Sequence, residues 1–413
     1  MNAPVVAITL HDGWFSAATG AGRSNQTLIQ AVAHALAPGV DLVLLPVDLH
    51  PTSPEYSPAA HQAMTGKLAD VPHQVLPLDN GTGAQRRFGD LAAFEQLGRH
   101  AATTLNALMR RHPQGLLIAI DQPFAGLGPL LDAPPGWRLL YLPRSSADHH
   151  ADPARAAWEQ HGLDGWIRRG ARFGAISTHM RTLLTSKGIP DEQVIDVPGG
   201  LAATDRVPLE SAPALPAGAG DGFLLSMGRA QPYKGFEDLL DALHLLATTG
   251  VRLPHLLLAA VTDGPTIAYQ RHLREHARAL AVSATVWTEF DPGLPGLLHH
   301  PGLRAVVVPS RNEPLGRIPL EAFAAGAGPV VATTAGGLAE TVIDSVTGFS
   351  AAPGDPPALA AAIGRALAVT AEEAGRLRAA GARLVAGRDY TSCITGVLEA
   401  LSPWATAAAA AKP

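Results

Sequence analysis

The sequence has one cysteine, Cys393, and only 5% aromatic residues among its 413 positions. A lone cysteine excludes an internal disulfide framework and a zinc site built from cysteines, and it suits a reducing compartment. A net charge of −5 gives no basic field for nucleic acid, and no RNA or DNA motif is present. No apolar run reaches the roughly 18 residues of a membrane span, and the first residues lack a signal-peptide pattern. We therefore expect a cytoplasmic protein without a nucleic acid partner.

Hydrophobic residues are abundant instead, at 47%, and they come in short aliphatic runs separated by helical patterns. Such alternation indicates parallel sheets covered on both faces. We predict an α/β protein with two Rossmann-like, doubly wound parallel-sheet domains facing across a cleft, where ligands meet the carboxyl ends of the strands. The expected strands are 5–10, 41–47, 116–120, 139–142, 174–176, 194–197, 223–227, 256–261, 285–288, 305–308 and 329–333.

Composition also marks the boundary between the domains. Residues 201–222 are dense in proline, alanine and glycine without periodicity, which is typical of an interdomain linker. We expect an N-terminal domain at 1–200 and a C-terminal domain at 223–385. A last helix should occupy 386–413 and end in a frayed alanine-rich tail.

The segment 306–341 carries two acids in a strand, turn and helix pattern. A buried strand ends at Val308, Glu313 follows in a polar turn, and Glu321 lies on the short helix after it. An ionised carboxylate only accepts hydrogen bonds and can take two of them from a vicinal diol. This segment therefore suits a ligand with two separated polyol parts.

A second polar turn follows the strand at 223–227. Arg229 and Lys234 lie in this turn, and Gly235 leads into a helix. Two cations beside a helix start favour an anion, because free backbone N–H groups and the helix dipole add to their charge. The guanidinium of an arginine can donate hydrogen bonds to two phosphate oxygens at once, while a lysine supplies a point charge. The alternative is a solvated cation pair that simply precedes a helix.

The spacing GR–x4–KG–F, then PS–x2–E–x7–E–A–x3–G–x2–PVV, then GG–x2–E resembles the retaining glycosyltransferases of family 4 over about 180 residues. This resemblance implies the GT-B fold, with a UDP-, GDP- or other nucleotide-sugar donor held mainly by the C-terminal domain. It implies an acceptor domain at 1–200 and a last helix that crosses back to it. Neither a cofactor nor a metal is implied, because the cations do the work of divalent ions.

The resemblance also assigns roles by position. Arg229 and Lys234 match the diphosphate-binding pair, and Glu313, which reaches the donor sugar hydroxyls, completes the catalytic set. Glu321 matches the acid that accepts from the ribose hydroxyls. Arg317 has no role in the pattern, and we interpret it as a surface charge. The turn that offers backbone amides to the donor is formed by Pro314, Leu315 and Gly316.

A glycine turn opens the N-terminal half. His11 and Asp12 follow the first strand, then come Gly20 and Gly22, and Ser24 is the expected cap of a helix. The resemblance assigns Gly20 and Gly22 to the donor phosphates and makes His11 and Asp12 acceptor-side candidates. Ordinary loop residues are the alternative.

The strand at 139–142 leads to two further acceptor-side candidates, Arg144 and His149, where related enzymes often present a histidine. We also expect a mobile loop at 52–87, which would be a lid if it covers the acceptor, and a base-binding segment near 287–290. The basic segment 166–173 is typical of a solvated helix end, and the alternative is that it contacts an anionic membrane.

Together these motifs predict a retaining, metal-independent glycosyltransferase that moves a sugar from a nucleotide-sugar donor to a polar small-molecule, natural-product or glycan acceptor. Three alternatives stay open: a nucleotide-sugar epimerase or phosphorylase on the same scaffold, a lipid-acceptor transferase at the membrane surface, and a catalytically silent binder of nucleotide sugars. The sequence does not select the nucleobase, the sugar, the acceptor, a general base or the oligomeric state.

Overall fold

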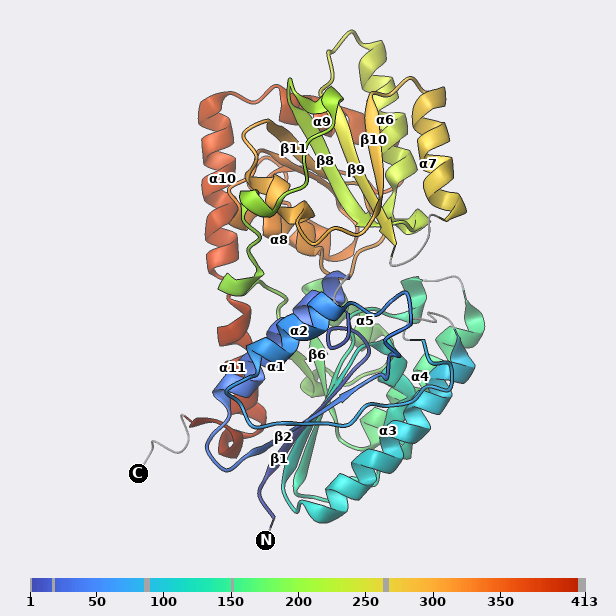
Figure 1. Ribbon diagram of the computed structural model, residues 1–413, viewed down its shortest axis with the longest axis vertical. Coiled ribbons are helices and arrows are strands. Elements are labelled where there is room, and N and C mark those ends of the chain that lie inside the picture. Colours follow the sequence, from blue (N-terminus) through green and yellow to red (C-terminus); the bar gives the residue numbers. More distant parts are fainter. Residues whose placement is uncertain (1, 17–18, 85–89, 150–151, 263–266, 408–413) are drawn as a thin grey trace. The chain divides into compact units, whose positions relative to one another are not determined.

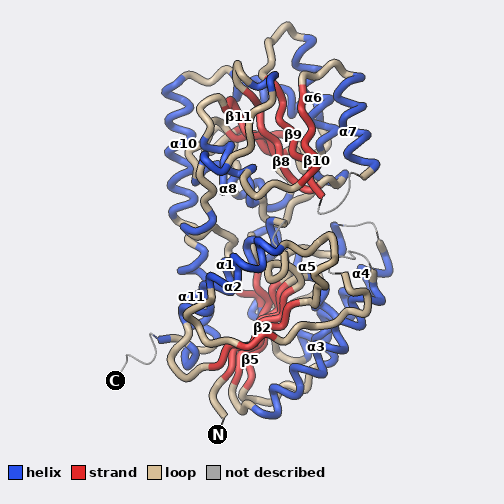
Figure 2. Tube along the Cα trace, in the orientation of Figure 1, coloured by secondary structure: helices blue, strands red, loops and turns tan. Residues whose placement is uncertain are grey.

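The computed structural model describes residues 2–16, 19–84, 90–149, 152–262 and 267–407 (Figure 1). The chain forms two compact units, of which the first contains Met1–Gly199 with Tyr390–Pro413 and the second contains Gly200–Asp389. Each unit is a parallel sheet with helices packed around it (Figure 2). The predicted α/β class with two Rossmann-like sheets is therefore confirmed.

The first sheet has seven parallel strands in the order β3-β2-β1-β4-β5-β6-β7. β1 and β4 are neighbours, but the chain continues from them toward opposite edges of the sheet. The carboxyl ends of these two strands therefore form a topological switch point, where such sheets bind ligands. The strands are β1 (Val5–Leu10), β2 (Asp41–Pro46), β3 (Gln74–Val75), β4 (Gly115–Ile120), β5 (Trp137–Leu142), β6 (Arg172–Ala175) and β7 (Val194–Asp196).

Helices cover both faces of this sheet, and β1 is buried along its whole length. The amphipathic face of α1 includes the buried Leu28, Ile29 and Val32, and the last helix, α11, packs against α1. The helices of this unit are α1 (Gly20–Ala35), α2 (Pro58–Lys67), α3 (Leu91–Arg111), α4 (Pro153–Arg168), α5 (Thr178–Ser186) and α11 (Tyr390–Leu401).

The second sheet has six parallel strands in the order β10-β9-β8-β11-β12-β13. Here β8 and β11 are the neighbours from which the chain continues in opposite directions, so their carboxyl ends form the switch point of this unit. The strands are β8 (Phe223–Arg229), β9 (His255–Thr262), β10 (Ala284–Glu289), β11 (Leu303–Val308), β12 (Val330–Thr333) and β13 (Phe349–Ala351).

The helices of the second unit bury two apolar clusters, one on each face of the sheet. They are α6 (Phe236–Thr248), α7 (Ala268–Ala279), α8 (Arg317–Ala324), α9 (Pro356–Leu367) and α10 (Ala371–Ala386). Across the residues that the structure describes, no helix of either unit has the length and apolar character that crossing a membrane requires.

The region 52–87 differs from the expected loop. It contains α2 and the short strand β3, so the prediction of an irregular segment is wrong at 58–67 and 74–75. The local cause is Ser57, whose side chain accepts from the N–H of Ala60, followed by a proline in the first turn of the helix. Both residues favour a helix start, although serine and proline are also common in irregular chain. Residues 85–87 of the expected loop lie outside the described residues.

The segment expected as a linker packs as part of the second unit. It carries three short 3-10 helices, η4 (Ala203–Asp205), η5 (Leu209–Ser211) and η6 (Ala217–Ala219). Gly293 approaches Ser211 so closely that a Cβ there would meet the Ser211 carbonyl oxygen at 1.8 Å, and Ala219 is buried in a core cluster. Small residues and proline here allow close packing rather than free movement.

Candidate functional site

The second unit brings together polar residues that follow its two switch-point strands. Lys234 closes a short 3-10 helix after β8, and Glu313 lies in the turn after β11. The Nζ atom of Lys234 lies 2.5 Å from Oε2 of Glu313. The structure thus joins two residues that the sequence placed in separate motifs.

The surroundings of this ion pair leave it partly open. The side chains of Lys234 and Glu313 are 14% and 16% exposed. The hydroxyl of Ser310 donates to the same Glu313 oxygen over 3.2 Å, and Lys234 Nζ lies 5.4 Å from the ring centre of Tyr233. A ligand can therefore reach a cation and an acid whose positions are already fixed by neighbours.

The loops after β8 and β11 are tied to each other by Arg311. Its backbone N–H donates to the Tyr233 carbonyl over 2.7 Å, and its guanidinium forks the Asp238 carboxylate over 2.8 and 2.6 Å. Arg229 Nη2 donates to the Tyr233 hydroxyl over 2.6 Å. Arg229 is thus the last residue of β8 and Lys234 lies in the loop after it, and this loop is anchored from the neighbouring strand by Arg311, an anchor that the sequence did not predict.

The turn from Pro314 to Gly316 holds Glu313 by close backbone packing. Gly316 has φ 86, and a Cβ there would lie 2.4 Å from Cδ2 of Leu338. The N–H of Gly337 donates to the Glu313 carbonyl over 2.9 Å. Glycine at 316 is thus required by both conformation and space. The proline of this turn has no N–H, so it cannot supply one of the expected amides.

The interpretation of Arg317 as a surface charge is wrong. Its side chain is only 7% exposed; Nε donates to Oε1 of Glu321 over 2.6 Å, and Nη2 lies 3.1 Å from Oδ2 of Asp205. Burial is possible because two carboxylates surround the guanidinium. Burial alone would lower the pKa of Arg317, but Glu321 and Asp205 outweigh it and raise that pKa above its usual value.

The switch point of the first unit holds Asp12 directly after β1. Its Oδ1 accepts from the N–H of Gly13 over 2.8 Å, and its Oδ2 accepts from the Thr19 hydroxyl over 2.6 Å. Thr19, not the predicted Ser24, caps α1, since its hydroxyl accepts from the N–H of Gly22. Gly20 and Gly22 therefore lie in the first helical turn, and a Cβ on Gly22 would meet Asp12 Oδ2 at 2.6 Å.

Asn25 connects this acid to two more elements. Its Nδ2 donates to the Asp12 carbonyl over 3.0 Å and to Oδ2 of Asp121, which follows β4, over 2.9 Å. Its Oδ1 accepts from Nε of Arg144 over 3.1 Å, and Arg144 Nη2 donates to the Tyr390 hydroxyl over 2.7 Å. Three strand ends and the first residue of α11 thus meet in one buried polar network.

Asp121 is the member of this network that the sequence reading missed. Burial raises the pKa of Asp121 to about 6 and Asp12 adds to the increase, whereas Arg144, Asn25 and the His11 N–H act against it. The backbone of Asp121 has φ 78, which is rare for a residue other than glycine. Such a strained, buried acid at a switch point is typical of a functional site.

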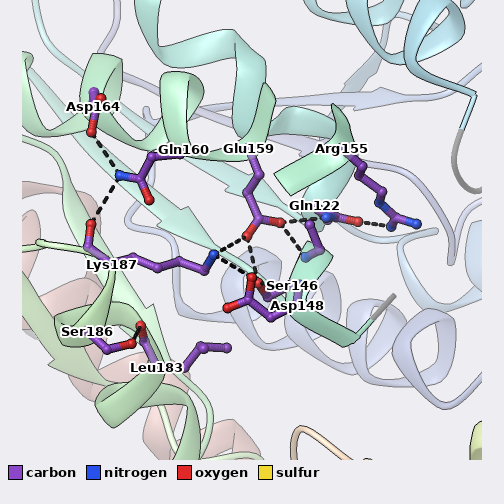
Figure 3. A network of polar contacts seen from close by, with 11 residues as sticks. Gln122, Ser146, Asp148, Arg155, Glu159, Gln160, Asp164, Leu183, Ser186 and Lys187 are labelled. Atoms are coloured by element: carbon purple, nitrogen blue, oxygen red, sulfur yellow. Dashed lines mark hydrogen bonds and ion pairs between the residues drawn. The ribbon is translucent and has the colours of Figure 1, made fainter. Parts of the chain in front are cut away.

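The loop after β5, which carries Arg144, is held by a second buried network (Figure 3). Glu159 on α4 accepts from the Ser146 hydroxyl over 2.6 Å, from the Ala147 N–H over 2.8 Å and from Gln122 Nε2 over 2.5 Å. Lys187 Nζ lies 3.3 Å from Glu159 Oε1. This acid therefore ties the loop after β5 to α4 and to the chain after β4.

The remaining predicted residues are placed as follows. His11 is 3% exposed, and its ring lies edge-on to Phe94 at 6.3 Å. His149 ends a short 3-10 helix, and its side chain lies outside the described part of the structure. In the expected base-binding segment Trp287 is half-buried and Phe290 is 38% exposed. Around the basic segment the arginines are exposed, while Trp166 is fully buried, as a solvated helix end requires.

The two switch points differ in the chemistry that they offer. The second unit presents cations beside a carboxylate, which suits a ligand that carries both phosphate and hydroxyl groups. The first unit presents buried acids, an amide and an arginine, which suits a polar ligand recognised by hydrogen bonds.

Comparison with known proteins finds a matching family and several relatives of this chain. Residues 210–383 match the model of the family described as glycosyl transferases group 1. The D-inositol 3-phosphate glycosyltransferase of Frankia alni is 33% identical over 272 residues, which make up 63% of this chain and 65% of that protein. The chain spans less than two thirds of the length of such curated relatives.

Solved structures are similar over nearly the whole chain. Sucrose-phosphate synthase from Thermosynechococcus elongatus has a TM-score of 0.74 at 23% identity, with 97% of this chain and 98% of that chain covered. Anabaena HepE in complex with UDP-glucose has a TM-score of 0.68 at 19% identity, with 97% and 99% covered. At these identities the similarity shows the fold, which is GT-B.

Proposed function

Since its second unit belongs to the glycosyl transferases group 1 family and the chain has the GT-B fold, we propose that this protein is a retaining glycosyltransferase. It moves a sugar from a nucleotide-sugar donor to a polar small-molecule, natural-product or glycan acceptor. The observation that carries the proposal is the contact between Lys234 and Glu313, which places a cation and an acid at one switch point.

In this proposal the second unit binds the donor. Arg229 and Lys234 hold the diphosphate, Glu313 accepts from hydroxyls of the donor sugar, and Glu321 accepts from the ribose. As the bond to the sugar breaks, negative charge grows on the diphosphate, and the two cations stabilise it more than they stabilise the bound donor. These cations make a divalent metal unnecessary.

The first unit binds the acceptor. His11, Asp12 and Arg144 are the proposed acceptor-side residues, and the network around Asn25 fixes the last two. The Frankia alni relative is named for transfer to D-inositol 3-phosphate, and this name supports a small, polar acceptor. No side chain is assigned as a covalent nucleophile, so we propose that the acceptor attacks from the face that the diphosphate leaves.

A thermal-shift screen tests the donor part of the proposal. UDP, GDP, ADP and dTDP are each compared with the corresponding nucleoside and with pyrophosphate, because bound ligand raises the unfolding temperature as its concentration exceeds the dissociation constant. One nucleoside diphosphate should raise the unfolding temperature more than its nucleoside does. If none of them binds, the proposal is wrong.

A product assay then separates transfer from the two other chemistries. The protein is incubated with the nucleotide sugar that matches the preferred diphosphate, with and without a mixture of polar acceptors. Transfer predicts a new glycoside only when an acceptor is present. An epimerised donor without acceptor would indicate an epimerase, and sugar phosphate formed with inorganic phosphate would indicate a phosphorylase.

A further inference from the structure

We propose that Arg317 is a positioning residue that fixes Glu321 for the donor ribose. Asp205, which lies where the chain enters the second unit, holds Arg317 in turn. The inference rests on the proposed function. Neither residue has a role in the motifs, and Asp205 lies in the segment that the sequence indicated as a linker.

The geometry of the three side chains is compact. Arg317 is the first residue of α8, and Glu321 lies one turn later on the same helix. The guanidinium contacts Glu321 through Nε over 2.6 Å and Asp205 through Nη2 over 3.1 Å. The exposed fractions of the side chains are 7% for Arg317, 4% for Glu321 and 7% for Asp205.

Burial gives this arrangement its rigidity. An arginine fork bonded on two sides can rotate little, so the carboxylate of Glu321 has a fixed direction before any ligand arrives. A binding group that is already oriented loses less entropy when the ligand binds. Because Oε1 of Glu321 already accepts from Arg317, the guanidinium also limits how the carboxylate can meet a vicinal diol.

Asp205 connects this pair to the place where the chain enters the second unit. Its Oδ2 also accepts from the N–H of Ala202 over 2.8 Å. The adjacent residue, Leu201, forms a β-bridge with Asp389, the last residue of the unit. The first and last residues of the second unit thus lie beside the carboxylate that holds Arg317. A displacement of this segment would reach Glu321 through two contacts, from Asp205 to Arg317 and from Arg317 to Glu321.

The rival interpretation is that Arg317 only balances buried charge. It predicts that variants lose stability without any change in how the site discriminates ribose. The positioning role predicts a specific loss, because Glu321 should recognise the ribose hydroxyls. The ratio of the dissociation constants for a 2′-deoxynucleoside diphosphate and its ribose counterpart measures this recognition.

The experiment compares full-length wild type with Arg317→Lys and Asp205→Asn by calorimetry. The probes are UDP, GDP and ADP, each compared with its 2′-deoxy counterpart. Arg317→Lys keeps the charge but loses the fork, and Asp205→Asn keeps the shape but loses the charge. We expect wild type to prefer the ribose form by about tenfold, and this preference to fall to about onefold in Arg317→Lys and to an intermediate value in Asp205→Asn.

The control is Arg365→Lys, since Arg365 forms a half-exposed ion pair with Asp344 elsewhere in the same unit. This variant should keep the wild-type preference. Asp205→Asn removes a single charge and keeps the test valid if Arg317→Lys fails to fold. The inference is overturned if wild type binds a nucleoside diphosphate without ribose preference, or if folded variants keep that preference. The proposed function fails separately, when wild type binds none of the four nucleoside diphosphates of the thermal-shift screen.

Discussion

Lys234 and Glu313 form an ion pair of 2.5 Å although 79 residues separate them in the sequence. Their contact exists because β8 and β11 are adjacent strands whose following turns meet at one sheet edge. Before a ligand binds, each side chain neutralises the other. An incoming diphosphate must therefore share the lysine with the carboxylate, which links phosphate binding to the acid proposed to hold the sugar.

Replacing Lys234 by alanine should lower kcat by about 10²- to 10³-fold, the usual effect of removing one group that stabilises charge in a transition state. Glu313→Gln should also lower kcat, and the double variant should lose less than the product of the two effects, because the residues are in contact. Steady-state kinetics at saturating donor measures this. Arg252→Ala, which removes a cation that is 90% exposed, is the control and should be neutral. An unchanged kcat in Lys234→Ala would rule out the assignment.

Gly22→Ala should impair turnover by displacing Asp12. The new Cβ would lie 2.6 Å from Asp12 Oδ2, and the helix at this position offers little room to move. Gly66→Ala is the matched control, since Gly66 also lies in a helix and has nothing within 4 Å of an added Cβ. This control should be neutral or stabilised by about 0.5–1 kcal/mol. Equal activity of the two variants would show that Asp12 does not need its observed position.

The raised pKa of Asp121 predicts a pH dependence of stability. The folded pKa of about 6 exceeds the ordinary value of 3.8, so the folded state binds the proton more tightly than the unfolded state does. This contribution to stability is complete below pH 3.8 and is lost as pH rises through about 6, which corresponds to roughly 3 kcal/mol. Asp121→Asn should remove it and should tolerate the positive φ. Urea unfolding from pH 4 to 8 measures the difference, and parallel curves for the variant and wild type would contradict the prediction.

Glu159→Ala should destabilise the first unit by about 3–5 kcal/mol, because it removes a buried acid from its partners and leaves polar groups unsatisfied. Asp164→Ala is the control on the same helix. Its carboxylate accepts from Gln160 over 3.0 Å and is only partly buried, so a loss within about 1 kcal/mol is expected. Equilibrium unfolding in urea compares the two variants. A Glu159 variant no less stable than the control would show that the network does not hold the loop after β5.

Sequence patterns predicted most of the strands, and the positions of Lys234 and Glu313 after two of them, for a clear physical reason, whereas the ion pair between the two residues was not predicted. Buried parallel strands are continuous aliphatic runs, and Lys234 and Glu313 each follow such a run. The donor-side and acceptor-side roles given to these and the other site residues stay predictions. The region 52–87 was misread because Ser57 and the proline after it signal both a turn and a helix start.

Other features have no local signal in the sequence. Arg317 and Glu321 are four residues apart, a spacing that is common for exposed pairs on a helix. Their burial depends on Asp205, which lies 112 residues before Arg317 and was part of an apparent linker. Glu159 and Asp121 likewise have partners from distant segments of the chain, which only the assembled sheet brings near.

The last helix of the chain gives the two units a different order of completion during synthesis. The second unit is a continuous stretch, Gly200–Asp389, so all of it has been synthesised before Tyr390 is added. The first unit must wait for α11, which packs against α1 and supplies the hydroxyl bonded to Arg144. During this interval the apolar surface of α1 that α11 covers stays uncovered, which is the kind of surface that chaperones bind. A released chain that ends before residue 390 would therefore carry a complete second unit and an aggregation-prone first one.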